Sequence, residues 1–155
     1  MTRSGALRLG DVAETERLGG ALADILRAGD VVALSGPLGA GKTTLARGVL
    51  AGLGLNGEAP SPSFSLVIAY EPPEVRLPLW HVDLYRIEDP VEVEELGLAD
   101  ARADAALLIE WPERMGAGLW GDALRLTIEL QSDGARRLTW AAPAAWESRW
   151  PPLRS

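Results

Sequence analysis

The chain has 155 residues, a length typical of one hydrophobic core, so we expect residues 1–155 to form a single domain. It has no cysteine and one histidine, which excludes a disulfide framework, a thiolate nucleophile and a metal site built from several Cys or His ligands. The formal net charge of −7 argues against strong direct binding of nucleic acid.

Apolar runs in the sequence are short. None approaches the ~20 residues of a membrane span, and the first residues lack the apolar core of a secretion signal. We therefore expect a soluble, cytoplasmic protein without a membrane partner.

The first elements are predicted to be a strand, a helix and a second strand. Residues 7–9 indicate a short strand, and Asp11 with Glu14 fits a capping box in front of an amphipathic helix. Gly29 fits a left-handed end for that helix. The unbroken apolar run 31–34 is typical of a strand that is buried on both faces.

A glycine-rich loop follows this strand directly and leads into a predicted helix that ends near Gly52. Gly36, Gly41, Lys42 and Thr43 match the spacing of a phosphate-binding loop. Such a loop points backbone N–H groups at an anion, and the positive end of the following helix adds to the attraction. Lys42, the only lysine of the chain, supplies a charge for the β- and γ-phosphates, and the Thr43 hydroxyl can ligate Mg²⁺.

The middle of the chain is predicted to hold a loop, two strands and a helix. Residues 56–62 read as a loop, and residues 64–70 and 78–84 read as strands joined by a proline-containing turn. Asp89 is expected to cap a helix over residues 90–97. The glutamates of this helix are expected to form a solvated face, and the alternative is an acidic face that docks a partner.

The last elements complete the fold prediction. Residues 105–109 predict a second buried strand, and residues 124–140 predict a hairpin that turns at Asp133-Gly134. We therefore expect an α/β protein, with a P-loop NTPase-like three-layer fold, a mixed central sheet and a C-terminal β-hairpin.

Two carboxylates, Asp83 and Glu110, each end a predicted strand. Ligands of open α/β sheets lie at the carboxyl ends of parallel strands, so either carboxylate can reach a magnesium ion or its waters. The alternatives are an ion pair with Arg86 for Asp83 and a surface position for Glu110. His81 lies away from the strand ends and is expected to be a structural or edge-strand residue.

The base of the nucleotide can be inferred from the single lysine. GTPases of the Ras type read guanine with an Asn-Lys-x-Asp segment, and here the only lysine is in the loop. Adenine is therefore the expected base.

Five segments occur together in an order that is specific beyond the phosphate loop. They are Gly39-Ala40-Gly41-Lys42-Thr43-Thr44, Ser61-Pro62-Ser63-Phe64-Ser65-Leu66-Val67, His81-Val82-Asp83-Leu84-Tyr85-Arg86, Glu95-Leu96-Gly97-Leu98 and Ile109-Glu110-Trp111-Pro112. With them the chain resembles the TsaE (YjeE) family, small ATPases of bacterial tRNA threonylcarbamoyladenosine biosynthesis. The resemblance spans residues 36–112, and Thr15 extends it toward the start.

This resemblance implies the following ATP-binding residues: Gly36, Gly39, Ala40, Gly41, Lys42, Thr43, Thr44, Ser63, Thr15 and Trp111. It implies catalytic roles for Lys42, Asp83 and Glu110, and Mg²⁺ ligation by Thr43, Glu110 and Asp83. The loop around Ser63 would act as a nucleotide-sensing switch. The implied partners are the TsaB and TsaD proteins, with tRNA held indirectly through their complex.

The sequence departs from the family pattern at two positions. Pro37 stands where the family usually has Asp, and it removes a carboxylate and one N–H beside the phosphates. Ser63 stands where the family usually has Thr, and it keeps the hydroxyl.

Two other functions fit the phosphate loop alone. The first is a small P-loop kinase of a metabolite, for which Arg136-Arg137 is the only arginine pair that could form a lid, although a pair at a turn is usually solvated. The second is a nucleotide-dependent binding module with negligible hydrolysis.

Overall fold

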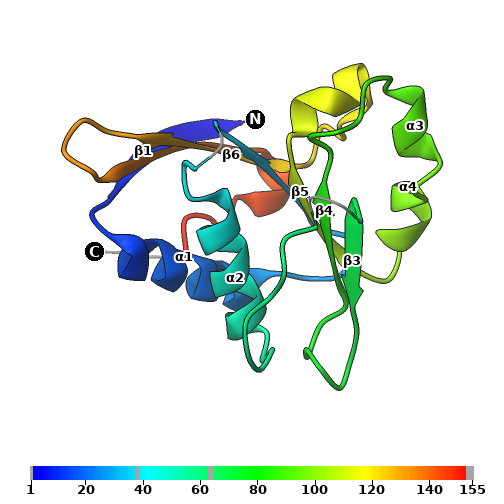
Figure 1. Cartoon of the computed structure of the whole chain (residues 1–155), viewed down its shortest axis with the longest axis horizontal. Helices are drawn as coiled ribbons and strands as arrows, with labels where there is room; N and C mark the ends of the chain where they lie inside the picture. Colours follow the sequence, from blue (N-terminus) through cyan, green and yellow to red (C-terminus); the bar gives the residue numbers. More distant parts are fainter. Residues whose placement is uncertain (1, 38, 63–64, 153–155) are drawn as a thin grey trace.

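A computed structural model describes residues 2–37, 39–62 and 65–152. Seven strands form a mixed sheet with the order β1-β7-β6-β2-β5-β4-β3 (Figure 1). The strands are β1 (Arg3–Leu9), β2 (Val31–Ser35), β3 (Val67–Tyr70), β4 (Leu79–Asp83), β5 (Ala106–Glu110), β6 (Leu124–Leu130) and β7 (Arg136–Ala142).

The centre of this sheet is parallel and its two sides are antiparallel. Strand β2 pairs in parallel with both β5 and β6, and β4 continues the parallel part beside β5. Strands β3, β7 and β1 add antiparallel pairs outside this centre. Four of the five residues of β2 are buried, as its apolar run predicts for a strand covered on both faces.

Helices cover both faces of the sheet (Figure 1). Helices α1 (Val12–Ile25) and α2 (Lys42–Gly52) pack against each other on one face, and α3 (Val91–Glu94), α4 (Leu98–Ala101) and the 3₁₀ helix η1 (Pro112–Gly118) belong to the other. A second 3₁₀ helix, η2 (Ala144–Trp146), follows β7. Each face has its own apolar core: Leu108 of β5 belongs to the first and Leu107 to the second. The expected three-layer α/β fold with a C-terminal β-hairpin is confirmed.

Helices α1 and α2 approach closely because glycine occurs at their contact. A Cβ on Gly48 would come within 2.4 Å of the carbonyl oxygen of Glu16, so a side chain there would push the helices apart. Among the described residues, no helix combines the length and the apolar character that a membrane crossing requires.

The start of α1 follows the sequence prediction more closely than its end. The Asp11 carboxylate accepts the N–H of Glu14 at 2.8 Å, as a capping residue does. The Glu14 carboxylate accepts the N–H of Gly10 rather than that of Asp11, so the capping box is shifted by one residue. The helix ends at Ile25, and the left-handed Gly29 lies beyond it in the turn into β2, so the prediction that Gly29 ends the helix is wrong.

Two predicted elements are shorter in the structure. Strand β3 begins at Val67, and the residue at 64 lies outside the described residues. The helix expected over residues 90–97 is only the four-residue α3, and the left-handed Gly97 then begins α4, which was not predicted. The glutamates of α3 are exposed, as expected for a solvated face.

Candidate nucleotide-binding site

The glycine-rich loop, residues 36–44 apart from residue 38, which lies outside the described residues, runs from the end of β2 into the first turn of α2 at the carboxyl end of the parallel strands. A Cβ on Gly36 would lie 2.4 Å from the Ile128 carbonyl oxygen, so only glycine fits where the loop leaves β2. The left-handed Gly41 then precedes α2, and no described side chain caps the start of this helix. The first N–H groups of α2 therefore remain available for an anion, as in a phosphate-binding loop.

Lys42 lies in a buried position between the loop and Trp111. Its Nζ donates a hydrogen bond to the Gly36 carbonyl oxygen at 2.6 Å and lies 3.8 Å from the centroid of the Trp111 ring. Only 4% of the residue is exposed. Burial lowers the pKa of Lys42, and nearby carboxylates, chiefly Glu110 and then Asp83, partly oppose this shift.

Asp83 and Glu110 occur at the places where the sequence predicts strand ends. They are the last residues of the parallel strands β4 and β5 and lie directly opposite each other in the register. Both are buried, and the charges of both raise the pKa of Lys42. The structure therefore brings Lys42, Asp83 and Glu110 together at one edge of the sheet.

His81 contributes to this site in a way that the sequence prediction missed. It lies on β4, which is inside the sheet between β5 and β3, so it is not on an edge strand. Its Nε2 lies 2.7 Å from Oε2 of Glu110, and both side chains are buried. This contact forms because β4 pairs in parallel with β5. The two residues are 29 positions apart in the sequence, so local sequence patterns do not indicate it.

Trp111 directly follows β5, and its ring contacts the ammonium of Lys42. Its backbone is left-handed, with φ of 59°, which is uncommon for a residue with a large side chain. The Tyr85 ring lies 4.9 Å away, at a tilt of 49°. The Lys42 ammonium therefore contacts an aromatic surface that comes from the segment directly after Glu110.

A cavity of about 330 Å³ lies beside the glycine-rich loop. Thr15 of α1 lines it together with Gly41 and Thr44, so the loop and a residue from the first helix share one cavity. Thr15 is buried, and its hydroxyl lies 3.4 Å from the Asp11 carbonyl oxygen. Gly134 and Arg136 from the hairpin also line it.

Arg136 braces the glycine-rich loop. Its Nε donates to the Ala40 carbonyl oxygen at 2.7 Å, and its Nη1 donates to the Gly134 carbonyl oxygen at 2.9 Å. The prediction that the arginine pair is simply solvated is wrong for Arg136, although it holds for the exposed Arg137. The hairpin returns over the loop only because β6 pairs in parallel with β2, which local sequence patterns do not indicate.

The other predicted binding residues fall into two groups. Gly39, Ala40, Thr43 and Thr44 lie in the loop or in the first turn of α2, next to Lys42. Ser63, the predicted switch residue, lies outside the described residues.

The available donors fit a magnesium ion. Thr43 offers a hydroxyl, and Asp83 and Glu110 offer carboxylates, which are the hard oxygen ligands that Mg²⁺ prefers. No group of three or more His, Cys, Asp and Glu side chains that could hold a metal occurs in the described part of the chain. Mg²⁺ commonly binds through one or two protein ligands and takes the rest from phosphates and water, so two carboxylates and a hydroxyl suit it.

An α/β sheet with a glycine-rich loop after its central strand β2, and with carboxylates at the ends of the next two strands, β5 and β4, defines a P-loop NTPase-like protein. The sequence model of "Threonylcarbamoyl adenosine biosynthesis protein TsaE" matches residues 9–138. The chain belongs to the TsaE family.

Similar proteins cover most of the chain. The "tRNA threonylcarbamoyladenosine biosynthesis protein TsaE" of Streptomyces coelicolor is 45% identical over 113 residues, which are 72% of this chain and 76% of that protein. The protein of the same name from Mycobacterium tuberculosis is 37% identical over 149 residues, which are 91% of this chain and 89% of that protein. The crystal structure of Bacillus subtilis YdiB superposes with a TM-score of 0.81 and 29% identity, covering 96% of this chain and 92% of the other.

Proposed function

We propose that this protein is an ATP-binding and ATP-hydrolysing subunit of tRNA threonylcarbamoyladenosine biosynthesis that acts with TsaB and TsaD. The observation that carries the proposal is the meeting of Lys42 with Asp83 and Glu110 beside a phosphate-binding loop, in a chain of the TsaE family. The names of the similar proteins support the pathway, and the geometry supports the chemistry.

Residues of the loop would bind the phosphates. The N–H groups between Gly39 and Thr44 supply fixed dipoles, and the Lys42 ammonium supplies a full charge. When phosphates bind, Lys42 exchanges the Gly36 carbonyl oxygen for phosphate oxygens, which carry more negative charge. The ammonium then stabilises the charge that develops on these oxygens as the terminal phosphate is transferred.

The two strand-end carboxylates would have different roles, one in binding the metal and one in orienting water. Glu110 and the Thr43 hydroxyl would hold Mg²⁺, which when bound neutralises negative charge on the β- and γ-phosphates. Asp83 would orient the attacking water or a water of the metal, since it ends the neighbouring strand. Water attacks the γ-phosphorus, the bond to the β–γ bridging oxygen breaks, and ADP, inorganic phosphate and the proton lost by the water leave.

The cavity beside the loop would hold the adenosine. It opens next to Gly41 and Thr44, so a nucleotide with its phosphates on the loop directs its nucleoside toward Thr15 and Arg136. Arg136 makes its hydrogen bonds to backbone carbonyl oxygens from a strand, which is a bracing position rather than a kinase lid.

The charge of the chain agrees with a role in which partners hold the tRNA. A net charge of −7 opposes direct contact with a phosphate backbone, so we expect tRNA to bind the TsaB–TsaD assembly.

One experiment separates this function from the alternatives. Terminally labelled ATP is incubated with the chain alone, with candidate metabolites, and with TsaB plus TsaD. We expect label in inorganic phosphate, released slowly by the chain alone and faster with the two proteins. Label in a metabolite would instead indicate a kinase, and label retained in ATP throughout would indicate a binding module.

A further inference from the structure

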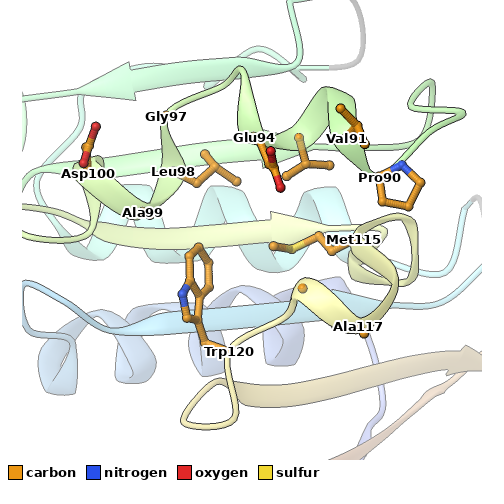
Figure 2. A pocket seen from close by; sticks show the side chains of 12 residues that line it. Pro90, Val91, Glu94, Gly97, Leu98, Ala99, Asp100, Met115, Ala117 and Trp120 are labelled. Atoms are coloured by element: carbon orange, nitrogen blue, oxygen red, sulfur yellow. The ribbon is translucent and has the colours of Figure 1, made fainter.

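A second cavity, of about 500 Å³, opens between α3, α4 and η1 (Figure 2). Its lining comes from residues 90–100 and 115–120, so it is separate from the glycine-rich loop. The apolar side chains of Val93, Leu98 and Met115 reach it from the buried core of this face. Val91, which is 61% exposed, extends this apolar surface to the outside.

The segment that forms one side of this cavity is strongly acidic. Residues 88–104 contain seven acidic residues and one arginine, which gives this segment a formal charge of −6 out of −7 for the whole chain. Glu94 and Asp100 of this segment line the cavity, and both are exposed. The one arginine, Arg102, is engaged by Asp122 at 2.6 Å and by the Gly29 carbonyl oxygen.

The apolar lining and the acidic residues at the mouth of this cavity restrict which molecules can bind there. Nucleic acid and anionic membranes are repelled by the acidic segment, and a second copy placed symmetrically would present the same charge. A protein segment with apolar side chains flanked by Lys or Arg would satisfy both the cavity and its mouth.

We infer that this cavity is the docking site for a basic and apolar segment of the partner assembly, an inference that rests on the proposed function for the existence of that partner. The cavity is connected to the nucleotide site by one element, because η1 begins directly after Trp111 and carries Met115 into the cavity wall. A partner bound here therefore contacts the short helix that follows the tryptophan against which Lys42 packs.

Two variants test the charge and the volume separately. Glu94→Lys reverses a charge at the mouth, and Ala117→Trp fills the cavity from an exposed wall position without changing the charge. Glu71→Lys in the β3–β4 turn and Ala69→Trp on the edge strand β3 are matched controls at exposed positions outside the cavity.

The measurement is a titration of the TsaB–TsaD assembly against each labelled variant in a saturating, non-hydrolysable ATP analogue. We expect both cavity variants to bind about tenfold or more weakly, whereas the two controls stay within about twofold of the unmodified chain. Nucleotide affinity and thermal midpoint should be unchanged in all four, and the loss in Glu94→Lys should shrink at high salt.

Three results would overturn the inference. Binding of the assembly by both cavity variants as tightly as by the controls would reject this cavity as the docking site and leave the proposed function intact. If the unmodified chain also failed to bind the assembly, the partner part of the proposed function would fail with it. A dimer of the unmodified chain in sedimentation, lost in both cavity variants, would assign the cavity to a second copy and also reject the inference.

Discussion

At the scale of single residues, the ammonium of Lys42 is the group on which the account depends most. It is held away from solvent by a carbonyl oxygen and an aromatic ring, and burial is the largest influence on its pKa. Because burial lowers this pKa below 10.5, the unfolded chain binds more protons than the folded chain between the lowered value and 10.5. The free energy of unfolding therefore rises with pH across this window, and below the window the charged lysine opposes folding.

This sign gives a prediction for Lys42→Met. The variant should lose ATP turnover and yet melt at pH 7 no lower than the unmodified chain, because it removes a charge whose burial is unfavourable. Its thermal midpoint should also rise less than that of the unmodified chain as the pH approaches 10. Melting curves recorded from pH 7 to pH 10 test both points, and a midpoint several degrees lower at pH 7 would show that Lys42 stabilises the fold.

We expect the negative charge of Glu110 to contribute to Mg²⁺ binding. Glu110→Gln keeps the shape of the side chain but removes the charge, so Mg²⁺-dependent ATP binding should weaken by about tenfold or more while Mg²⁺-free ADP binding changes little. Calorimetric titrations with and without Mg²⁺ measure the two affinities. Equal losses under both conditions would indicate a local folding defect instead.

His81 should position the Glu110 carboxylate. His81→Phe keeps a ring but leaves a buried carboxylate oxygen without its 2.7 Å partner, which should lower the free energy of unfolding by about 1–3 kcal/mol. The Mg²⁺ dependence of ATP binding should weaken in the same direction as in Glu110→Gln, and His81→Gln, which keeps a donor, should restore part of it. A His81→Phe variant with unchanged Mg²⁺ dependence would limit His81 to packing.

At the level of secondary-structure elements, the C-terminal hairpin contacts the glycine-rich loop and holds its backbone through a hydrogen bond. Arg136 on β7 bonds to the Ala40 carbonyl oxygen, whereas the side chain of its neighbour Arg137 is exposed. Arg136→Ala should weaken ATP binding by about tenfold because the loop loses a brace, and Arg137→Ala should leave it unchanged. Equilibrium binding of a fluorescent ATP analogue compares the pair, and equal affinities would show that the loop holds its shape without the hairpin.

Elements with strong local signals were predicted well. The apolar run of β2, the glycine pattern before α2 and the alternation of β6 and β7 each reflect forces within a few residues, and all three appear in the structure. The region of α3 and α4 was predicted less well. A left-handed glycine is typical of a helix end, but here Gly97 is the residue that precedes α4. The end of α1 depends in the same way on a turn into β2 that the sequence does not reveal.

At the scale of the whole molecule, the strand order assembles the site, and the strand order could not be predicted locally. Asp83 and Glu110 were expected at strand ends, but their direct opposition requires β4 and β5 to be neighbours in register. The roles of His81 and Arg136 were missed because each depends on a contact across 29 or 96 residues of sequence. Residue types and spacing therefore indicated the phosphate chemistry, whereas the supporting contacts came from tertiary structure.

In the proposed function, the loop, Lys42 and the strand-end carboxylates hydrolyse ATP, and a partner assembly depends on this hydrolysis. The most direct measurement is the rate of phosphate release from ATP by the unmodified chain and by Lys42→Met, each with and without TsaB plus TsaD. We expect slow release by the unmodified chain, faster release with the two proteins, and background release by Lys42→Met under both conditions. Release by Lys42→Met at the unmodified rate, or no response of the unmodified chain to the two proteins, would contradict it.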